Sequence, residues 1–115
     1  MLDIAFEIAR ANPTKFQKMG AVITYKGKVI AVGLNSNKSH PMQKKYGKNS
    51  KSIFLHAEID AIKNGLRNHK KEDFKNFEIH VARCMKNGLP GMAKPCRGCQ
   101  KAIDEYLFKA VHWTK

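Results

Sequence analysis

The stretch that decides the fold lies at residues 19–33 and reads MGAVITYKGKVIAVG. It contains two runs rich in β-branched residues, 21–25 and 28–32, which the dipeptide Lys26-Gly27 separates. Two such runs around a two-residue turn are typical of a tight β-hairpin. We therefore predict two antiparallel strands here.

Helical patterns lie on both sides of this hairpin. Residues 2–11 carry two neighbouring rows of apolar residues at helical spacing, and the pattern stops at Asn12-Pro13, because proline disfavours helix in the residue before it. The predicted inward rows are Leu2, Phe6, Ala9 and Ile4, Ile8, Ala11. Beyond the hairpin, a second helix is predicted to end near residues 67–68, with one buried face made of Leu55, Ile59, Ile62 and Leu66.

The second half of the chain alternates between strands and helices. Strands are predicted at 77–83 and 110–113, and a helix at 97–108 buries Ala102, Ile103, Tyr106 and Leu107, whereas the Gly- and Pro-rich residues 84–95 form a loop. The order is α-β-β-α-β-α-β, and the helix between the last two strands implies that they are parallel. We predict an α/β fold, a three-layer α/β/α sandwich with a mixed sheet, in one domain spanning residues 1–115.

The composition narrows the classes of partner. Lys and Arg outnumber Asp and Glu by 22 to 9, a net charge of +13 that attracts polyanions and phosphate-bearing molecules. Residues 36–53 contain five lysines and no acid, and they are either a solvated loop or a loop that contacts phosphate. No apolar run reaches the roughly 18 residues of a membrane helix, and the N-terminus lacks the features of a secretory signal. We expect a cytoplasmic protein with reduced thiols.

Two short motifs together indicate a metal site. Cys96 and Cys99 lie three apart at the predicted start of the third helix, where helix geometry puts both thiols on one face and the helix N-terminus stabilises thiolates. His56 lies at the predicted start of the second helix. One imidazole and two thiolates leave the fourth tetrahedral position of zinc for water, as in catalytic sites. The alternative is a structural centre that His69, His80 or His112 closes as fourth ligand.

Glu58 lies two residues after His56. A carboxylate beside a zinc-bound water can take its proton and deliver it to a substrate ring nitrogen and then to a leaving amine. The alternative is a helix-start glutamate that interacts favourably with the helix dipole. We favour the catalytic role.

The segments His56-Ala57-Glu58 and Pro95-Cys96-Arg97-Gly98-Cys99 match the H-x-E and P-C-x-x-C signature of zinc-dependent base deaminases. Over nearly its whole length the chain resembles the cytidine/deoxycytidylate deaminase superfamily. The resemblance implies one zinc ion per chain on His56, Cys96 and Cys99, with Glu58 as proton shuttle. It also implies that the Ala57 backbone N–H and Asn35 contact the substrate.

The sequence departs from that superfamily at two places. Asp60 stands where many nucleotide deaminases have asparagine, and the chain ends after the fourth predicted strand, where family members usually add a fifth strand and a helix. We therefore expect a C-terminally short version of the fold. Its sheet would expose an edge, and closely related folds commonly associate, so we expect a homo-oligomer.

The resemblance implies a zinc-dependent hydrolase that deaminates a cytosine nucleoside or nucleotide, of the dCMP or cytidine type, to the uracil product with release of ammonia. One alternative is a deaminase of cytosine or adenine in single-stranded DNA or tRNA, in which the basic surface holds phosphates and Tyr46 stacks on a base. Another is a zinc-stabilised nucleic-acid-binding module without activity. We expect Phe54 and Trp113 to pack in the core and Cys84 to be buried. No partner is identified for His40 or His80.

Overall fold

The computed structural model of the chain describes residues 1–14, 17–36, 41 and 56–115. Most of the lysine-rich stretch 36–53, with His40 and Tyr46, and also Phe54 and Leu55, lies outside the described residues. The elements in chain order are α1 (Leu2–Arg10), β1 (Lys18–Tyr25), β2 (Lys28–Leu34), α3 (Ala57–Gly65), the 3-10 helix η1 (Lys71–Asn76), β3 (Glu78–Cys84), β4 (Pro90–Gly91), α4 (Arg97–Glu105) and β5 (Ala110–Trp113).

The predicted order of helices and strands is confirmed, with η1 and the two-residue strand β4 in addition. Strand β4 lies in the segment 84–95 that was predicted as loop. Among the described residues, every helix is too short and too polar to cross a membrane.

The hairpin forms as predicted. Strands β1 and β2 pair antiparallel, with Tyr25 opposite Lys28, and the two turn residues Lys26 and Gly27 have φ angles of 50° and 80°. Positive φ at both positions matches the twist of the flanking strands. Strand β1 begins at Lys18, earlier than predicted, because residues 18–20 pair with 82–84 of β3. The start of β1 lies beside the end of β2, with Gly20 opposite Leu34, and Gly33 of β2 lies close to the Ala57 backbone at the start of α3.

The sheet is mixed, in the order β2-β1-β3-β4, and β5 pairs with β3. The predicted parallel pair is confirmed, since Glu78 of β3 lies opposite Ala110 of β5 and Val81 opposite Trp113 in parallel register. Strand β4 pairs antiparallel with the last two residues of β3. Strands β4 and β5 thus occupy the same side of β3, one after the other.

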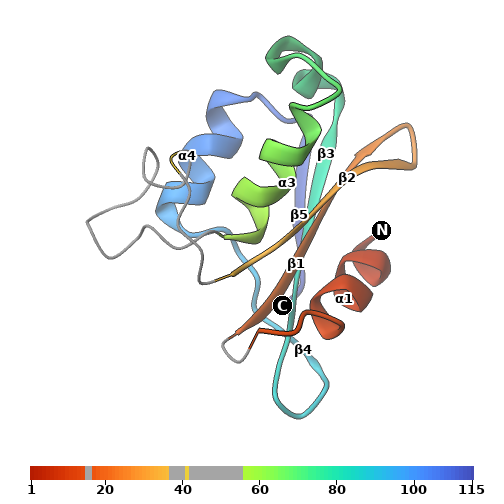
Figure 1. Cartoon of the computed structure of the whole chain (residues 1–115), viewed down its shortest axis with the longest axis vertical. Coiled ribbons are helices and arrows are strands. Elements are labelled where there is room, and N and C mark those ends of the chain that lie inside the picture. The colour runs from red at the N-terminus through yellow and green to blue at the C-terminus, as the bar shows by residue number, and fades with distance from the viewer. Residues whose placement is uncertain (15–16, 37–40, 42–55) are drawn as a thin grey trace.

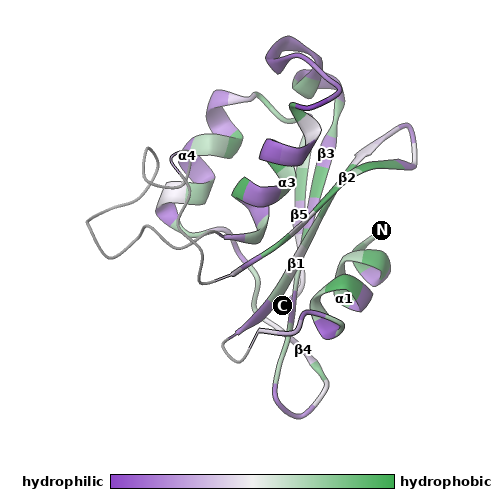
Figure 2. Cartoon of the chain, in the orientation of Figure 1, coloured by the Kyte–Doolittle hydropathy of each residue, from purple (hydrophilic) through white to green (hydrophobic). Residues whose placement is uncertain are grey.

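Helices cover both faces of the sheet, as predicted for a three-layer sandwich. Figure 1 shows α1 on one side and α3 with α4 on the other. The larger core lies between the sheet and the helices α3 and α4, and Trp113 packs against it; its largest fully buried side chains include Phe74, Ile23, Ile59, Ile62 and Ile79. In Figure 2 hydrophobic residues follow the strands, and hydrophilic residues cover the outward sides of α3 and α4.

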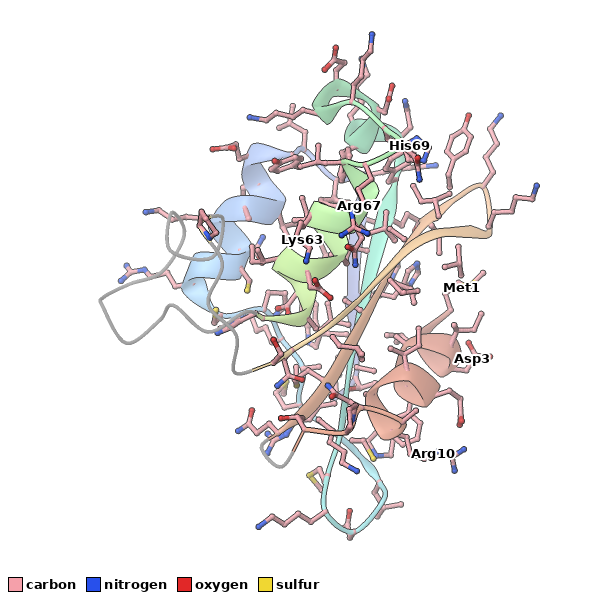
Figure 3. All side chains as sticks on the ribbon, in the orientation of Figure 1. Met1, Asp3, Arg10, Lys63, Arg67 and His69 are labelled. Carbon is pink, nitrogen blue, oxygen red and sulfur yellow. The ribbon has the colours of Figure 1, made fainter. Side chains whose placement is uncertain are left out.

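Helix α1 closes the smaller core, which contains Ala5, Ala9, Val22, Ala82 and Cys84. The predicted burial of Cys84 is confirmed, with 7% exposure. Met1 and Asp3 lie at the start of the helix and Arg10 at its end (Figure 3), so that the charges of Asp3 and Arg10 complement the helix dipole.

All three helices end earlier than predicted, and residues near the ends of each apolar pattern are exposed. Ile4 is 38%, Leu66 37% and Leu107 69% exposed, and Ala11 is exposed as well, so their predicted burial is wrong. Leu107 follows the C-cap of α4 with a φ of 58°, a left-handed conformation that ends the helical period before this residue. Helix α1 contacts the sheet through its alanines, which turns Ile4 away from the core.

Candidate metal centre and active site

The three predicted metal ligands lie at the starts of two neighbouring helices. His56 is the N-cap of α3 and Cys96 the N-cap of α4, and Cys99 lies in the first turn of α4. Figure 1 shows the two helices next to each other on the same face of the sheet. The Cys96 sulfur accepts the backbone N–H of Cys99 at 3.5 Å, which satisfies one of the donors that a helix leaves unpaired at its start.

The side chains of these residues converge. His56 Nδ1 lies 3.3 Å from Cys99 Sγ and 3.6 Å from Cys96 Sγ, and the three ligand atoms all lie within 4.8 Å of one another. A tetrahedral zinc ion with Zn–N and Zn–S bonds of about 2.0 and 2.3 Å would separate nitrogen and sulfur by about 3.5 Å. The donor set and its spacing therefore fit zinc, with Nδ1 as the ligating nitrogen of His56. Cys99 is buried whereas Cys96 is exposed, so that the group is accessible from one side.

The electrostatics of the group favour a cation. Hydrogen bonds from Cys99 and His56 lower the pKa of Cys96 to about 3, so this sulfur is a thiolate at neutral pH. The hydrogen bond with Cys96 raises the pKa of His56. The hydrogen bond to Cys96, together with burial, raises the pKa of Cys99. The Cys99 thiol therefore keeps its proton at neutral pH in the metal-free site, and a bound divalent cation would displace it.

Glu58 lies in the first turn of α3 and is 4% exposed. Burial raises the pKa of its carboxyl, whereas its own backbone N–H and the neighbouring His56 lower it. A hydrogen bond with Cys99 places the carboxyl beside the candidate ligands. Burial thus makes the Glu58 carboxyl easier to protonate than an exposed carboxyl, which favours a role as general acid or base.

The two predicted substrate contacts, Ala57 and Asn35, lie in different surroundings in the structure. Ala57 is the first residue of α3 and is fully buried. Asn35 follows β2, and its Oδ1 accepts the Met19 N–H at 2.9 Å and the Asn12 Nδ2 at 2.8 Å, while its own Nδ2 donates to the Gln17 carbonyl at 2.6 Å. The Asn35 amide therefore ties the segment before β1 to the end of β2. Its contact with a substrate stays a prediction.

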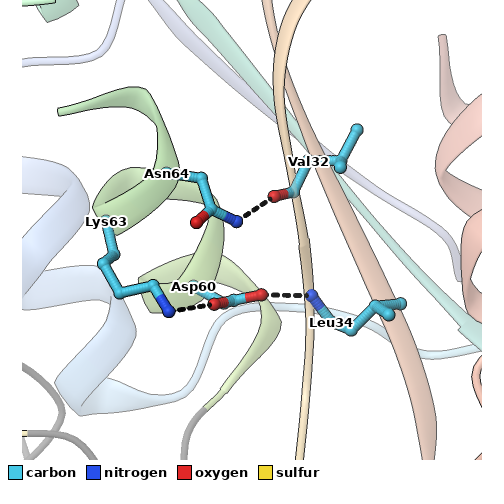
Figure 4. Close-up of polar contacts among 5 residues, drawn as sticks. All are labelled: Val32, Leu34, Asp60, Lys63 and Asn64. Carbon is cyan, nitrogen blue, oxygen red and sulfur yellow. Dashed lines mark hydrogen bonds and ion pairs between the residues drawn. The ribbon is translucent and has the colours of Figure 1, made fainter. Parts of the chain in front are cut away.

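Two polar side chains of α3 hold the helix against the edge strand β2 (Figure 4). The carboxylate of Asp60 accepts the N–H of Leu34 at 3.0 Å and forms an ion pair with Lys63 at 3.0 Å. Asn64 Nδ2 donates to the Val32 carbonyl at 2.7 Å. These contacts, which we call the β2 clamp, satisfy backbone groups that an edge strand leaves unpaired.

The sequence analysis missed the β2 clamp, although the spacing of its two residues in the sequence indicates a shared helix face. Asp60 and Asn64 are four residues apart and therefore share one face of the helix. The identity of the backbone groups that they bind could not be inferred from helical spacing. The clamp gives Asp60, the position of departure from related deaminases, a structural role next to the candidate site.

Gly33 allows β2 and α3 to approach each other. A Cβ atom at this position would lie 2.3 Å from the Ala57 carbonyl oxygen and 2.3 Å from the Ala61 nitrogen. Both are backbone atoms of α3, so a side chain here would push the helix away from the strand. This requirement also escaped the sequence analysis, because it arises from a tertiary contact.

Comparisons with known proteins identify a matching family. The sequence model of the family described as the cytidine and deoxycytidylate deaminase zinc-binding region matches residues 1–115. A search of curated protein sequences gave no match.

Solved structures show the same fold. The dCMP deaminase of the cyanophage S-TIM5 in apo form has a TM-score of 0.67 and 22% identity, over 97% of this chain and 77% of that one. Its complex with dCMP and dUMP has a TM-score of 0.67 and 21% identity, over 97% and 76%. Guanine deaminase from Bacillus subtilis has a TM-score of 0.58 and 24% identity, over 97% and 60%. At these identities the likeness establishes the α/β architecture.

Proposed function

The chain belongs to the cytidine and deoxycytidylate deaminase family, and on this premise we propose that it is a zinc-dependent hydrolase that deaminates a cytosine nucleoside or nucleotide. The observation that carries the proposal is the convergence of His56 Nδ1 with both cysteine sulfurs, at 3.3 and 3.6 Å, beside the buried Glu58. A structural Cys2His2 centre would need a second imidazole in this group. Among the described residues, the group contains His56 as its one histidine.

We assign His56, Cys96 and Cys99 as the ligands of one zinc ion. When bound, zinc supplies a Lewis acid that lowers the pKa of a coordinated water molecule. The Cys96 thiolate holds negative charge at the N-terminus of α4, and the hydrogen bond from the Cys99 N–H fixes this sulfur before the metal arrives. Burial of Cys99 and Glu58 keeps bulk water from the inner side of the site.

Glu58 carries the proton transfers. The reaction adds water to C4 of the base, breaks the C4–N bond and releases ammonia, so protons must pass from water to the ring nitrogen and then to the leaving amine. The buried Glu58 carboxyl can receive a proton and return it to the substrate, so that the proton does not leave the site. The Ala57 backbone N–H, at the start of α3, and Asn35 are the proposed contacts of the base or sugar.

A monophosphate is the proposed form of the substrate. The net charge of +13 favours a phosphate group, and the exposed Arg97 directly follows the ligand Cys96. The cyanophage dCMP deaminase, which has the same fold, is described in complex with dCMP and dUMP. Guanine deaminase shares the fold too, so the base has to be established by assay.

The test is a mass-spectrometric assay of zinc-loaded protein on cytosine, cytidine, deoxycytidine, CMP, dCMP, guanine and short single strands. We expect conversion of the amino group to a carbonyl, with ammonia, on dCMP or CMP. The matched control is Glu58→Gln, which keeps the shape of the side chain and should retain zinc while losing turnover by at least about 10²-fold. Absence of ammonia from every substrate would refute the proposal, and an unchanged rate in the variant would remove Glu58 from the mechanism.

A second candidate is deamination within a single-stranded nucleic acid. A hollow of about 760 Å³ is lined by four cationic side chains, Arg10, Lys18, Arg83 and Lys86, and Arg10 lies at the end of α1 (Figure 3). Such a surface can hold the phosphates of a strand. Oligonucleotide affinity measured at increasing salt distinguishes the candidates, because only a polynucleotide enzyme should show a steep loss. The expected homo-oligomer and cytoplasmic location stay predictions.

A further inference from the structure

A second cluster of ligand-type side chains lies on the opposite face of the sheet from the candidate metal centre. Glu78 and His80 alternate along β3 with Ile79 and Val81, which belong to the larger core under α3 and α4. Because side chains alternate between faces, Glu78 and His80 point to the α1 side. His112 of β5 lies directly opposite His80 in parallel register. Two adjacent strands thus bring two imidazoles and one carboxylate together.

The three side chains contact one another. Each offers one ligand atom, and these atoms all lie within 4.8 Å of one another. His112 Nε2 lies 2.9 Å from Glu78 Oε1, and the rings of His80 and His112 stack with centroids 4.7 Å apart and planes 12° apart. The cluster is therefore already assembled by the backbone register of β3 and β5.

A hydrogen bond with a residue of the neighbouring strand β1 orients the His80 ring. Its Nε2 lies 3.0 Å from Thr24 Oγ1 of β1, and both residues are buried, with 8% and 2% exposure. Histidines that bind metals usually have such a partner on the other ring nitrogen, which fixes the ring and leaves one nitrogen for the ion. With Nε2 held by Thr24, the remaining nitrogen of His80 is Nδ1.

The other two members lie at the surface. The side chains of Glu78 and His112 are 34% and 43% exposed, so an ion can reach them and the His112 ring can rotate toward it. Burial, with the nearby His112, lowers the pKa of His80 to about 4, so its ring is neutral at neutral pH. The hydrogen bond with His112 lowers the pKa of Glu78, which is therefore a carboxylate.

We propose that Glu78, His80 and His112 form a second metal site, which binds a divalent transition ion and ties β5 to β3. Two imidazoles and a carboxylate suit zinc, cobalt and nickel rather than magnesium or calcium. Ligand atoms around such an ion lie about 3.3 Å apart, so a rotation of the exposed His112 ring closes the site. The site would be structural, since β5 is a four-residue strand that pairs, within the described part of the chain, with β3 alone.

The test is a titration of the metal-free full chain with cobalt(II), followed by absorbance. Wild type should bind two equivalents per chain. Only the equivalent bound by Cys96 and Cys99 should give a thiolate-to-cobalt charge-transfer band. His112→Ala and Glu78→Gln should each bind one equivalent and keep that band. His69→Gln is the matched control, since His69 packs its ring against Phe77 (centroids 5.2 Å apart) outside the cluster, and it should bind two.

A second measurement tests the link between the strands. With the cysteine site already filled, the second equivalent should slow amide exchange in β5 of wild type and of His69→Gln, and should leave exchange in His112→Ala unchanged. Saturation of wild type at one equivalent would overturn the proposal, and so would a second equivalent that persists in both His112→Ala and Glu78→Gln. Unchanged exchange in β5 of wild type would overturn its structural role. None of these outcomes depends on deaminase activity.

Discussion

The β2 clamp yields a quantitative prediction for Asp60→Ala. The substitution removes the acceptor of the Leu34 N–H and the partner of Lys63, both at 3.0 Å. A hydrogen bond to a charged acceptor contributes about 1.5–3 kcal/mol. The ion pair adds at most about 1 kcal/mol, because solvent still reaches both side chains, which are 16% and 28% exposed, and screens their charges. We expect the free energy of unfolding to fall by about 2 kcal/mol, a large part of the reserve of a small domain.

Two matched variants separate the two contacts. Lys63→Ala keeps the carboxylate and should lose only the ion pair, at most about 1 kcal/mol. Asp60→Asn keeps an oxygen that can accept the Leu34 N–H, so it should lose the ion pair and the charge of the acceptor, but less stability than Asp60→Ala. Urea unfolding of all four proteins in the same metal state gives the comparison. For a slope of about 2 kcal/mol per molar urea, Asp60→Ala should lower the midpoint by about 1 M. If Asp60→Ala is no less stable than Asp60→Asn, the hydrogen bond to β2 does not hold the helix.

Three further substitutions probe the contacts around the sheet. Gly33→Ala should destabilise the fold by more than about 3 kcal/mol in thermal unfolding, because its Cβ would lie 2.3 Å from two backbone atoms of α3, and near-native stability would refute the close approach. Cys96→Ser should contain one equivalent of zinc fewer than wild type in elemental analysis, whereas Cys84→Ser, on the other face of the sheet, should contain as much as wild type. The free energy of unfolding of wild type should fall relative to that of His80→Gln as pH falls from 6.5 to about 4. Burial lowers the pKa of His80 in the folded protein, so the unfolded chain takes up the proton first. Parallel curves of unfolding free energy against pH for the two proteins would contradict this.

The hairpin and the candidate site could be predicted because their signals are local. Lys26 and Gly27 adopt the positive φ angles that a two-residue turn requires, and β-branched runs flank them. His56 and Cys96 each begin a helix, so the sequence that starts the helix also places the ligand. In both cases the key residues, the turn dipeptide or the ligand, are neighbours in sequence of the residues that form the strand or helix.

The sequence analysis was wrong or incomplete where contacts between helices and strands determine the structure. Leu66 and Leu107 continue the apolar period, yet the helices end before them, and both side chains are exposed. The backbone partner of Asp60 and the space that Gly33 leaves for α3 depend on how a helix sits on a strand, which periodicity does not encode. The cluster of Glu78, His80 and His112 depends on the register of β5 beside β3, and the sequence analysis found no partner for His80.

The candidate site is held by a continuous series of contacts that begins far from the cysteines. Asn35 ties the residues before β1 to the end of β2, and the β2 clamp ties that end to α3. His56 is the N-cap of α3, and its ring contacts the sulfurs of Cys96 and Cys99. Geometry that a metal needs to within a few tenths of an ångström therefore depends on side chains that touch neither metal nor base. An asparagine at position 60 can keep the hydrogen bond to Leu34 without the charge, so the departure at Asp60 changes the ion pair with Lys63 before it changes any contact with a substrate.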